Sequence, residues 1–189
     1  MYLISAYFDE NTTRTLQRFI EAIAAAAGND FMTGNGVPPH LTISALDLRP
    51  EAEPALAEAV RTLEPSLCEG AIYIAAPGQL LPYVMFAAPV LNQYLQELSE
   101  EVYRRVSAVP TARVSRFYRP MSWLPHITLA KTLTPEQMQA AFAVMQHRFA
   151  PLTGRITSLG LSRTNPYRDL LRIPAGMNPG KQKRIENNK

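Results

Sequence analysis

The chain has few of the residues that build cross-links or structural metal sites. Among its 189 residues there are one cysteine, Cys68, and three histidines. A single cysteine excludes an internal disulfide, and no other cysteine or histidine lies near Cys68 at the spacing of a zinc site. We therefore interpret Cys68 as a buried structural thiol.

Long apolar runs and glycine-rich phosphate loops are also missing. No stretch approaches the roughly 18 uninterrupted apolar residues of a membrane-spanning helix, and the opening MYLISAYFDENT lacks the charged segment and cleavage site of a signal peptide. Neither a dinucleotide-binding nor a P-loop glycine pattern occurs, which argues against a nucleotide cofactor held in that way. With 47% hydrophobic residues, the chain can bury a substantial core. We expect a soluble, cytoplasmic protein with no membrane contact, no cofactor and no obligate protein partner.

Charge is distributed unevenly along the chain. Residues 1–102 hold 13 acidic and 4 basic residues, whereas residues 103–189 hold 3 acidic and 15 basic residues. Between Val102 and Pro135 there are six basic residues and no acidic one. Such a segment favours an anionic ligand such as a phosphate, although basic runs are also common on solvated surfaces. The polar, basic residues 175–189 predict a disordered tail.

Local patterns predict two successive units with the same order of elements. In the first unit we expect strands at 2–9, 40–46, 71–76 and 83–89, and helices at 11–27 and 50–63. In the second unit we expect helices at 89–108 and from 135 onward, and strands at 126–129, 154–163 and 168–173. Short turns between neighbouring strands require antiparallel pairing. The repeat therefore predicts an α+β fold, with one bilobal domain over 1–174 and lobes at about 1–88 and 89–174 that can exchange strands.

The sequence Pro-His-aliphatic-Thr-aliphatic occurs twice, once in each unit. Because side chains alternate along a strand, His40 shares a face with Thr42, and His126 shares a face with Thr128. The aliphatic residues between them then face the core. If the two units face each other about a pseudo-twofold axis, both imidazoles and both hydroxyls converge on one cleft.

This set of side chains suits a phosphodiester substrate. One imidazole, with an ordinary pKa near 6.5, can accept a proton from the attacking water or hydroxyl while the other protonates the leaving oxygen. The threonine hydroxyls can donate hydrogen bonds to the non-bridging oxygens. A two-histidine metal site is the competing interpretation, but neither strand carries an acidic residue or cysteine at ligand spacing, so we expect no metal. The third histidine, His147, is interpreted as a surface residue of a helix.

The two motifs, HLTI at 40–43 and HITL at 126–129, resemble those of the 2H phosphoesterase superfamily. That superfamily includes the LigT-like 2'-5' RNA ligases and RNA 2',3'-cyclic phosphodiesterases, and the resemblance covers roughly residues 1–174. It implies a bilobal α+β fold with two antiparallel sheets, outer helices and a central cleft. It also implies that the histidines and threonines of the motifs form a catalytic tetrad, and that the substrate is RNA or a nucleotide with a cyclic phosphate or a 2'-5' linkage, hydrolysed or joined without a metal.

One residue departs from the family pattern. Many LigT-like members have arginine two residues beyond the second motif, where this chain has Lys131. Lysine supplies the positive charge but not the bidentate fork of a guanidinium group. The difference argues against RNA ligation in particular and does not affect phosphoesterase chemistry.

The loop before the second motif interleaves arginines with aromatic residues. Guanidinium groups for phosphates and aromatic rings for bases are typical of sites for nucleotides and single-stranded RNA. Alternatively, the aromatics pack on the core and the arginines are solvated. The candidate substrate-binding residues are Lys131, Arg119, Arg116, Tyr118, Trp123 and Tyr83, with Arg163, Tyr167 and Arg168 as weaker candidates. The predicted activity is a metal-independent phosphoesterase, with a 2'-5' RNA ligase or a catalytically silent nucleotide- or RNA-binding module as alternatives, and with the acid and base roles of the histidines left open.

Overall fold

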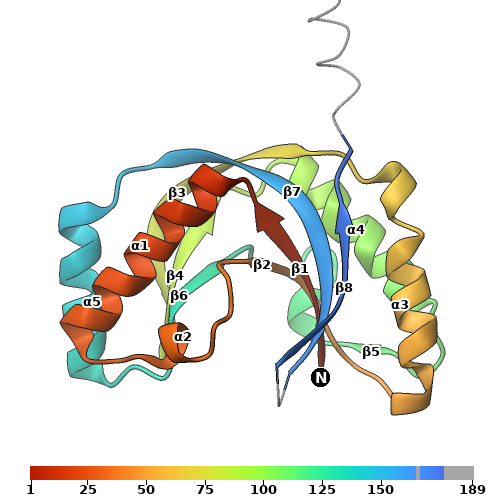
Figure 1. Ribbon diagram of the computed structural model, residues 1–189, viewed down its shortest axis with the longest axis horizontal. Helices are drawn as coiled ribbons and strands as arrows, with labels where there is room; N and C mark the ends of the chain where they lie inside the picture. The colour runs from red at the N-terminus through yellow and green to blue at the C-terminus, as the bar shows by residue number, and fades with distance from the viewer. Residues whose placement is uncertain (165–166, 177–189) are drawn as a thin grey trace, which may run out of the picture.

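The computed structural model describes residues 1–164 and 167–176 and has the α+β architecture that the sequence predicts (Figure 1). Its elements, with η for a 3-10 helix, are β1 (Tyr2–Phe8), α1 (Glu10–Ala27), α2 (Phe31–Gly34), β2 (Leu41–Asp47), η1 (Pro50–Ala52), α3 (Glu53–Arg61), η2 (Glu64–Ser66), β3 (Gly70–Leu80), β4 (Val84–Pro89), α4 (Gln93–Ser107), β5 (Arg113–Val114), η3 (Arg116–Tyr118), β6 (Ile127–Ala130), α5 (Pro135–Arg148), β7 (Leu152–Arg163) and β8 (Arg168–Pro174).

The differences from the predicted elements are mostly at their ends. The strand expected at 71–76 continues to Leu80, because residues that look like a turn pair with β4. The helix expected at 89–108 begins only at Gln93, after Asn92, whose side chain accepts a hydrogen bond from the Leu95 N–H. Each motif histidine precedes its strand by one residue. The short α2, β5 and η3 were not expected, since segments of two to four residues carry no periodicity.

The strands form one connected antiparallel network in the order β1-β2-β6-β4-β3-β7-β8, with β1 also paired to β7. The two sheets implied by the family resemblance are therefore joined. The joining strand is β7, which at twelve residues is long enough to pair with β1 and β8 in one half and with β3 in the other. A second junction lies where β2 meets β6.

The helices pack outside the sheet in mixed pairs. The contacts join α1 to α5 and α3 to α4, so each pair combines one helix from each repeat. Figure 1 shows these two pairs on opposite sides of the molecule, with β7 arching between them. None of the helices in residues 1–164 and 167–176 is long and apolar enough to cross a membrane.

The hydrophobic core takes the helix-facing side of the strands. On the motif strands the core residues are the aliphatic ones, as the alternation predicts: Leu41 and Ile127 are fully buried, and so is Leu129. Their polar neighbours in sequence then lie on the opposite face of the sheet. Thus hydrophobic packing of one face determines the direction in which the motif histidines and threonines point.

The region predicted as a tail begins within the fold. The N–H of Gly176 donates a hydrogen bond to the carbonyl of Leu67, and the carbonyl of Gly176 accepts one from the N–H of Glu69. The expectation of disorder was therefore wrong for Gly176. The rest of that prediction, residues 177–189, lies outside the described residues.

Candidate active site

The antiparallel pairing of β2 with β6 brings the two motifs together. Leu41 lies opposite Ile127. Continuing this register by one residue places His40 opposite Thr128, and in the other direction it places the threonine of the first motif opposite the histidine of the second. Directly opposed residues have their Cβ atoms about 5 Å apart. Each imidazole therefore has the hydroxyl of the other motif as its cross-strand neighbour.

Both imidazoles are held by the same local hydrogen bond. Nδ1 of His40 donates to the carbonyl of Pro38 at 2.9 Å, and Nδ1 of His126 donates to the carbonyl of Leu124 at 2.8 Å. Because a carbonyl oxygen can only accept, Nδ1 carries a proton in both rings. Nε2 is therefore the atom left to exchange a proton with a substrate, as an acceptor in the neutral ring or a donor in the cation.

The electrostatic surroundings of His40 favour its neutral form. Burial is the main cause that lowers the pKa of His40 below its ordinary value. The hydrogen bond to Pro38 and the carboxylate of Asp169 oppose this shift, whereas the positive charges of His126 and Arg172 add to it. At neutral pH this imidazole is poised to accept a proton.

An aromatic side chain lies against each imidazole. The ring centroid of Tyr7 is 6.2 Å from that of the first imidazole, and Phe86 meets the second imidazole edge-on at 5.7 Å. Each aromatic ring covers a glycine on the neighbouring strand: a Cβ at Gly160 would lie 2.7 Å from Tyr7, and a Cβ at Gly78 would lie 2.5 Å from Phe86. Glycine at both positions therefore provides the space that each ring occupies.

Two of the predicted substrate-binding aromatics are structural instead. Trp123 is 7% exposed, and its indole N–H donates at 3.1 Å to the carbonyl of Thr42. Tyr118 is half-buried, packs against the core and has its pKa raised by burial. These contacts favour the alternative interpretation, in which the aromatic residues attach the loop to the core, with Trp123 supporting the first motif.

The remaining candidates lie at the surface. Arg116 stacks on the ring of the exposed Phe117 at 4.8 Å, and Arg119 is exposed in the same loop. Tyr83 is 58% exposed in the turn before β4. Lys131 follows the last residue of β6, and its ammonium group lies 5.7 Å from the centroid of Phe31 on α2. No contact within the described residues brings Lys131 to the histidines.

The neighbours of the first histidine were missed by sequence reasoning. Tyr7 lies on the motif face of β1, and the guanidinium carbon of Arg172 lies 3.6 Å from the centroid of its ring. Asp169 is close enough to both Arg172 and the first imidazole to act on the pKa of His40. The alternation along β1 could have placed Tyr7 on the correct face, but no sequence signal marks Arg172.

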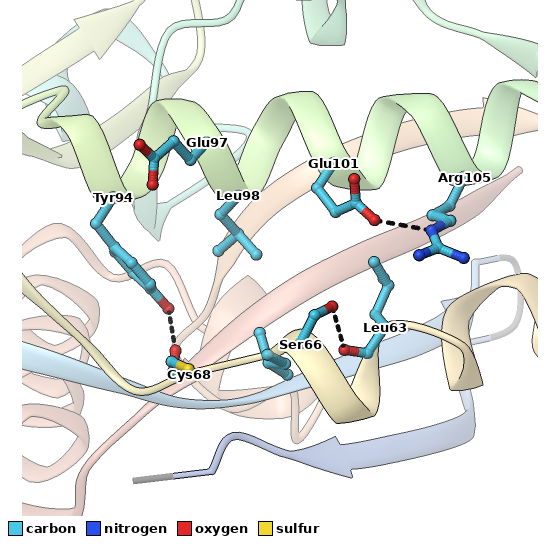
Figure 2. Close-up of a pocket in the computed structure, with 9 residues that line it drawn as sticks. Leu63, Ser66, Cys68, Tyr94, Glu97, Leu98, Glu101 and Arg105 are labelled. Atoms are coloured by element: carbon cyan, nitrogen blue, oxygen red, sulfur yellow. Dashed lines mark hydrogen bonds and ion pairs between the residues drawn. The ribbon is translucent and has the colours of Figure 1, made fainter. Parts of the chain in front are cut away.

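A pocket of about 500 Å³ lies apart from the motifs, between η2 and α4 (Figure 2). Its wall includes Cys68, which is half-buried, whereas the sequence predicted a buried thiol. Polar groups of this pocket are paired with each other: Arg105 binds Glu101 at 2.8 Å, and the hydroxyl of Tyr94 donates to the carbonyl of Cys68. Since none of its lining residues is a histidine, it offers no acid-base pair like that of the motifs.

The motif face carries the groups of acid-base catalysis and phosphate binding, which are imidazoles and hydroxyls. Among residues 1–164 and 167–176, no group of three or more histidine, cysteine, aspartate or glutamate side chains is placed to hold a metal ion. The imidazoles and hydroxyls of the motifs can perform proton transfer and hydrogen bonding.

Comparisons with known proteins agree with this class of site. The model of the 2'-5' RNA ligase superfamily matches residues 12–168. The chain belongs to this superfamily, whose members are 2H phosphoesterases, as the paired motifs predict. A search of curated proteins finds no match.

Several solved structures share the fold. Escherichia coli LigT complexed with 3'-AMP is 18% identical, with 92% of this chain and 97% of that chain covered at a TM-score of 0.60. TT0787 of Thermus thermophilus is 20% identical, with 92% and 96% covered at a TM-score of 0.58. Usb1 of Kluyveromyces marxianus is 13% identical, with 92% and 95% covered at a TM-score of 0.52. At these identities the likeness establishes the fold.

Proposed function

We propose that the chain is a metal-independent phosphoesterase that opens 2',3'-cyclic phosphates or cleaves related 2'-5' phosphodiester bonds in nucleotides or RNA. The observation that carries this proposal is the matched hydrogen bonding of the two imidazoles, which leaves both Nε2 atoms available. A structural histidine needs no such symmetry. Two matched imidazoles with opposed hydroxyls suit the transfer of one proton to, and one proton from, the same phosphate.

In the proposed reaction His40 is the general base, because its neutral form is favoured. Its Nε2 accepts a proton from a water molecule while the water oxygen forms a bond to phosphorus. The bond from phosphorus to the 2' or 3' oxygen breaks, and Nε2–H of His126 donates its proton to that leaving oxygen. The hydroxyls of Thr42 and Thr128 donate hydrogen bonds to the non-bridging oxygens, where negative charge accumulates.

The family relationship supports this assignment without choosing the substrate. Members of the superfamily are phosphoesterases and ligases, and LigT has been crystallised with 3'-AMP, ATP and NADP+. These complexes of LigT support a nucleotide or RNA substrate for this chain. The ammonium group of Lys131 lies over the ring of Phe31, so the residue at the position of the family's arginine gives no support to RNA ligation.

The test is an activity panel in the presence of EDTA. The substrates are 2',3'-cyclic nucleotides, 2'-5' oligoadenylates and RNA with a cyclic-phosphate end, incubated with the wild type, His40→Ala and His126→Ala. Loss of a general acid or base should lower turnover by about 100-fold or more in either variant. His147→Ala is the matched control, since His147 is exposed in the last turn of α5 and distant in sequence from both motifs.

Each outcome of the panel discriminates between interpretations. Turnover that persists in EDTA and is lost in both motif variants supports the proposal. Turnover that survives in both variants, or that EDTA abolishes, overturns it. Joined RNA ends as the main product would identify a ligase, and nucleotide binding without turnover of any substrate would identify a silent binding module.

A further inference from the structure

An extra residue in β8 brings two charged side chains to the motif face of the sheet. Along most of their length, β8 and β7 pair residue by residue, but the register shifts between Leu161 and Ser162. As a result Arg172 lies opposite Gly160 and Asp169 lies opposite Ser162. Leu161 faces the core, so its neighbours in β7 face the motif side. Asp169 and Arg172 therefore point to the same face although they are three residues apart.

Arg172 is held beside the first motif by a cation–π contact with Tyr7. Its guanidinium carbon lies 3.6 Å from the Tyr7 centroid, which in turn lies 6.2 Å from the imidazole of His40. Because both distances are measured from the Tyr7 centroid, the guanidinium carbon lies within about 10 Å of the imidazole centre. This close cation–π contact holds the guanidinium group over the Tyr7 ring.

The donors of Arg172 are not used up by its neighbours. Asp169 lies 3.6 Å away, beyond hydrogen-bond distance, and one of its carboxylate oxygens accepts a 2.7 Å hydrogen bond from the Tyr167 hydroxyl. The close neighbours of the guanidinium group are Tyr7 beneath it and Asp169, and 45% of the Arg172 side chain is exposed. A guanidinium group in this state is ready for a bidentate contact with an oxyanion.

Among residues 1–164 and 167–176, no strand takes the place of β8 beside the second motif. Phe86 covers Gly78 as Tyr7 covers the neighbourhood of Gly160. However, β3 pairs with β7 only through its first residues, Gly70–Ile74, so no described strand flanks Gly78 on the side away from β4. The two halves of the site are therefore alike at the histidines and different at Arg172.

We propose that Arg172 binds a second phosphate group of the substrate, on the 5' side of the nucleotide whose phosphate lies at the tetrad. This inference rests on the proposed function, because it assumes a nucleotide there. A pseudo-symmetric tetrad accepts a phosphate in either sense, and a cation on one side only removes that ambiguity. Arg172 thus orients the substrate and favours nucleotides or RNA ends that carry two phosphates over those that carry one.

Binding measurements with a matched pair of ligands test the proposal. Calorimetry compares adenosine 3'-monophosphate with adenosine 3',5'-bisphosphate in the wild type and in Arg172→Gln. The bisphosphate should bind the wild type about 10-fold more tightly, as one charge-assisted bidentate contact predicts, and Arg172→Gln should remove that preference while changing monophosphate affinity by less than about two-fold. Equal affinities in the wild type, or equal weakening of both ligands in Arg172→Gln, overturns the proposal.

Two further variants separate charge from position. Arg168→Gln removes the same charge from the same strand, but Arg168 pairs with Arg163, whose guanidinium group reaches Glu53 on the helix side of the sheet. It should keep the preference for the bisphosphate. Tyr7→Leu removes the aromatic ring on which Arg172 stacks and should reduce the preference for the bisphosphate. An unchanged preference in this variant would count against the stacked arrangement.

A kinetic comparison distinguishes failure of this inference from failure of the proposed function. The substrates are adenosine 2',3'-cyclic phosphate and a dinucleotide that ends in the same cyclic phosphate. Arg172→Gln should raise KM for the dinucleotide about 10-fold and change KM for the mononucleotide by less than about two-fold. If the wild type turns over neither substrate, the proposed function fails, and the calorimetric preference still decides the role of Arg172. If both are turned over and Arg172→Gln affects them equally, only the Arg172 assignment fails.

Discussion

Leu41 of β2 lies opposite Ile127 of β6, and this pair joins the strands that carry the two motifs. The neighbouring strands repeat the same irregularity on both sides: the register of β1 shifts between Ile4 and Ser5, and that of β4 shifts between Met85 and Phe86. Backbone pairing therefore sets each motif against the other. The site follows from how the two repeats pair, because neither repeat alone supplies an imidazole with a hydroxyl across the strand.

This arrangement predicts that the threonine hydroxyls act directly on the phosphate. Thr42→Val and Thr128→Val keep the shape of the side chain and remove the hydroxyl, so kcat for a cyclic phosphate should fall about 100-fold, as for loss of one transition-state donor. Thr42→Ser and Thr128→Ser keep the hydroxyl and should recover most of the rate. Steady-state kinetics measures both series, and equal losses with valine and serine would assign the threonines to packing.

The glycines beneath the aromatic rings predict a second effect on activity. Alanine at Gly78 or Gly160 places a methyl group less than 3 Å from the ring of Phe86 or Tyr7, so the ring must move from its place beside the imidazole. We expect a loss of about 1–3 kcal/mol in the free energy of unfolding, typical of overpacking, and a fall in kcat/KM. Urea unfolding measures the free energy of unfolding, and steady-state kinetics measures kcat/KM.

Gly34→Ala is the control for these substitutions. A Cβ at Gly34 meets no atom within 4 Å, so the free energy of unfolding should change by no more than about 0.5 kcal/mol. Wild-type activity in both Gly78→Ala and Gly160→Ala would show that the rings do not orient the histidines.

The role of Trp123 can be tested through its own fluorescence, since it is the only tryptophan of the chain. A buried indole is inaccessible to iodide, so iodide should quench the emission weakly in the folded protein and strongly in urea. Trp123→Phe leaves the carbonyl of Thr42 without its indole donor and should lower the free energy of unfolding by about 1–3 kcal/mol. Strong quenching in the folded state would restore Trp123 as an accessible stacking surface.

The sequence predicted much of this site because period-two alternation is a local property. It places His40 and Thr42 on one face and their aliphatic neighbours in the core without knowledge of the partner strand. The register between β2 and β6 is different in kind, since it joins residues 86 positions apart and depends on the whole sheet. The burial of Trp123 is likewise a tertiary fact, and a loop tryptophan beside arginines looks the same in sequence whether it binds a ligand or the core.

The connectivity of the sheet could not be predicted from the sequence for a similar reason. A long alternating strand such as β7 shows that it is half-buried but not which strands it pairs with, so the joining of the two sheets could not be predicted. Arg172 reaches the motif face through a one-residue shift of register in β8. Such a shift leaves no mark in composition or periodicity.

Asp9 predicts a stability effect away from the site. Its carboxylate caps α1 through the N–H of Thr12 at 2.9 Å and also accepts the N–H of Arg155 on β7 at 2.8 Å. Burial alone would raise the pKa of Asp9, but these hydrogen bonds outweigh it and lower the pKa. Asp9→Ala should therefore cost about 2 kcal/mol in the free energy of unfolding at pH 7, as for loss of a strong N-cap.

Chemical denaturation of Asp9→Ala beside the exposed Glu10→Ala measures this cost. Because the folded pKa of Asp9 is depressed, its contribution is present above pH 3.8 and is lost as the pH falls through the folded value. The difference between the wild type and Asp9→Ala should shrink over that range. A difference that stays constant with pH would show that the carboxylate charge does not matter.

His40 predicts a separate pH dependence at higher pH. Burial lowers its folded pKa below 6.5, so between these two values the unfolded chain binds more protons than the folded one. Stability is therefore complete above pH 6.5 and falls as the pH drops through the folded pKa of His40. Urea unfolding from pH 8 to pH 5 should show a steeper loss for the wild type than for His40→Gln, which has no proton to bind, and parallel losses in the two proteins would contradict a lowered pKa of His40 in the folded state.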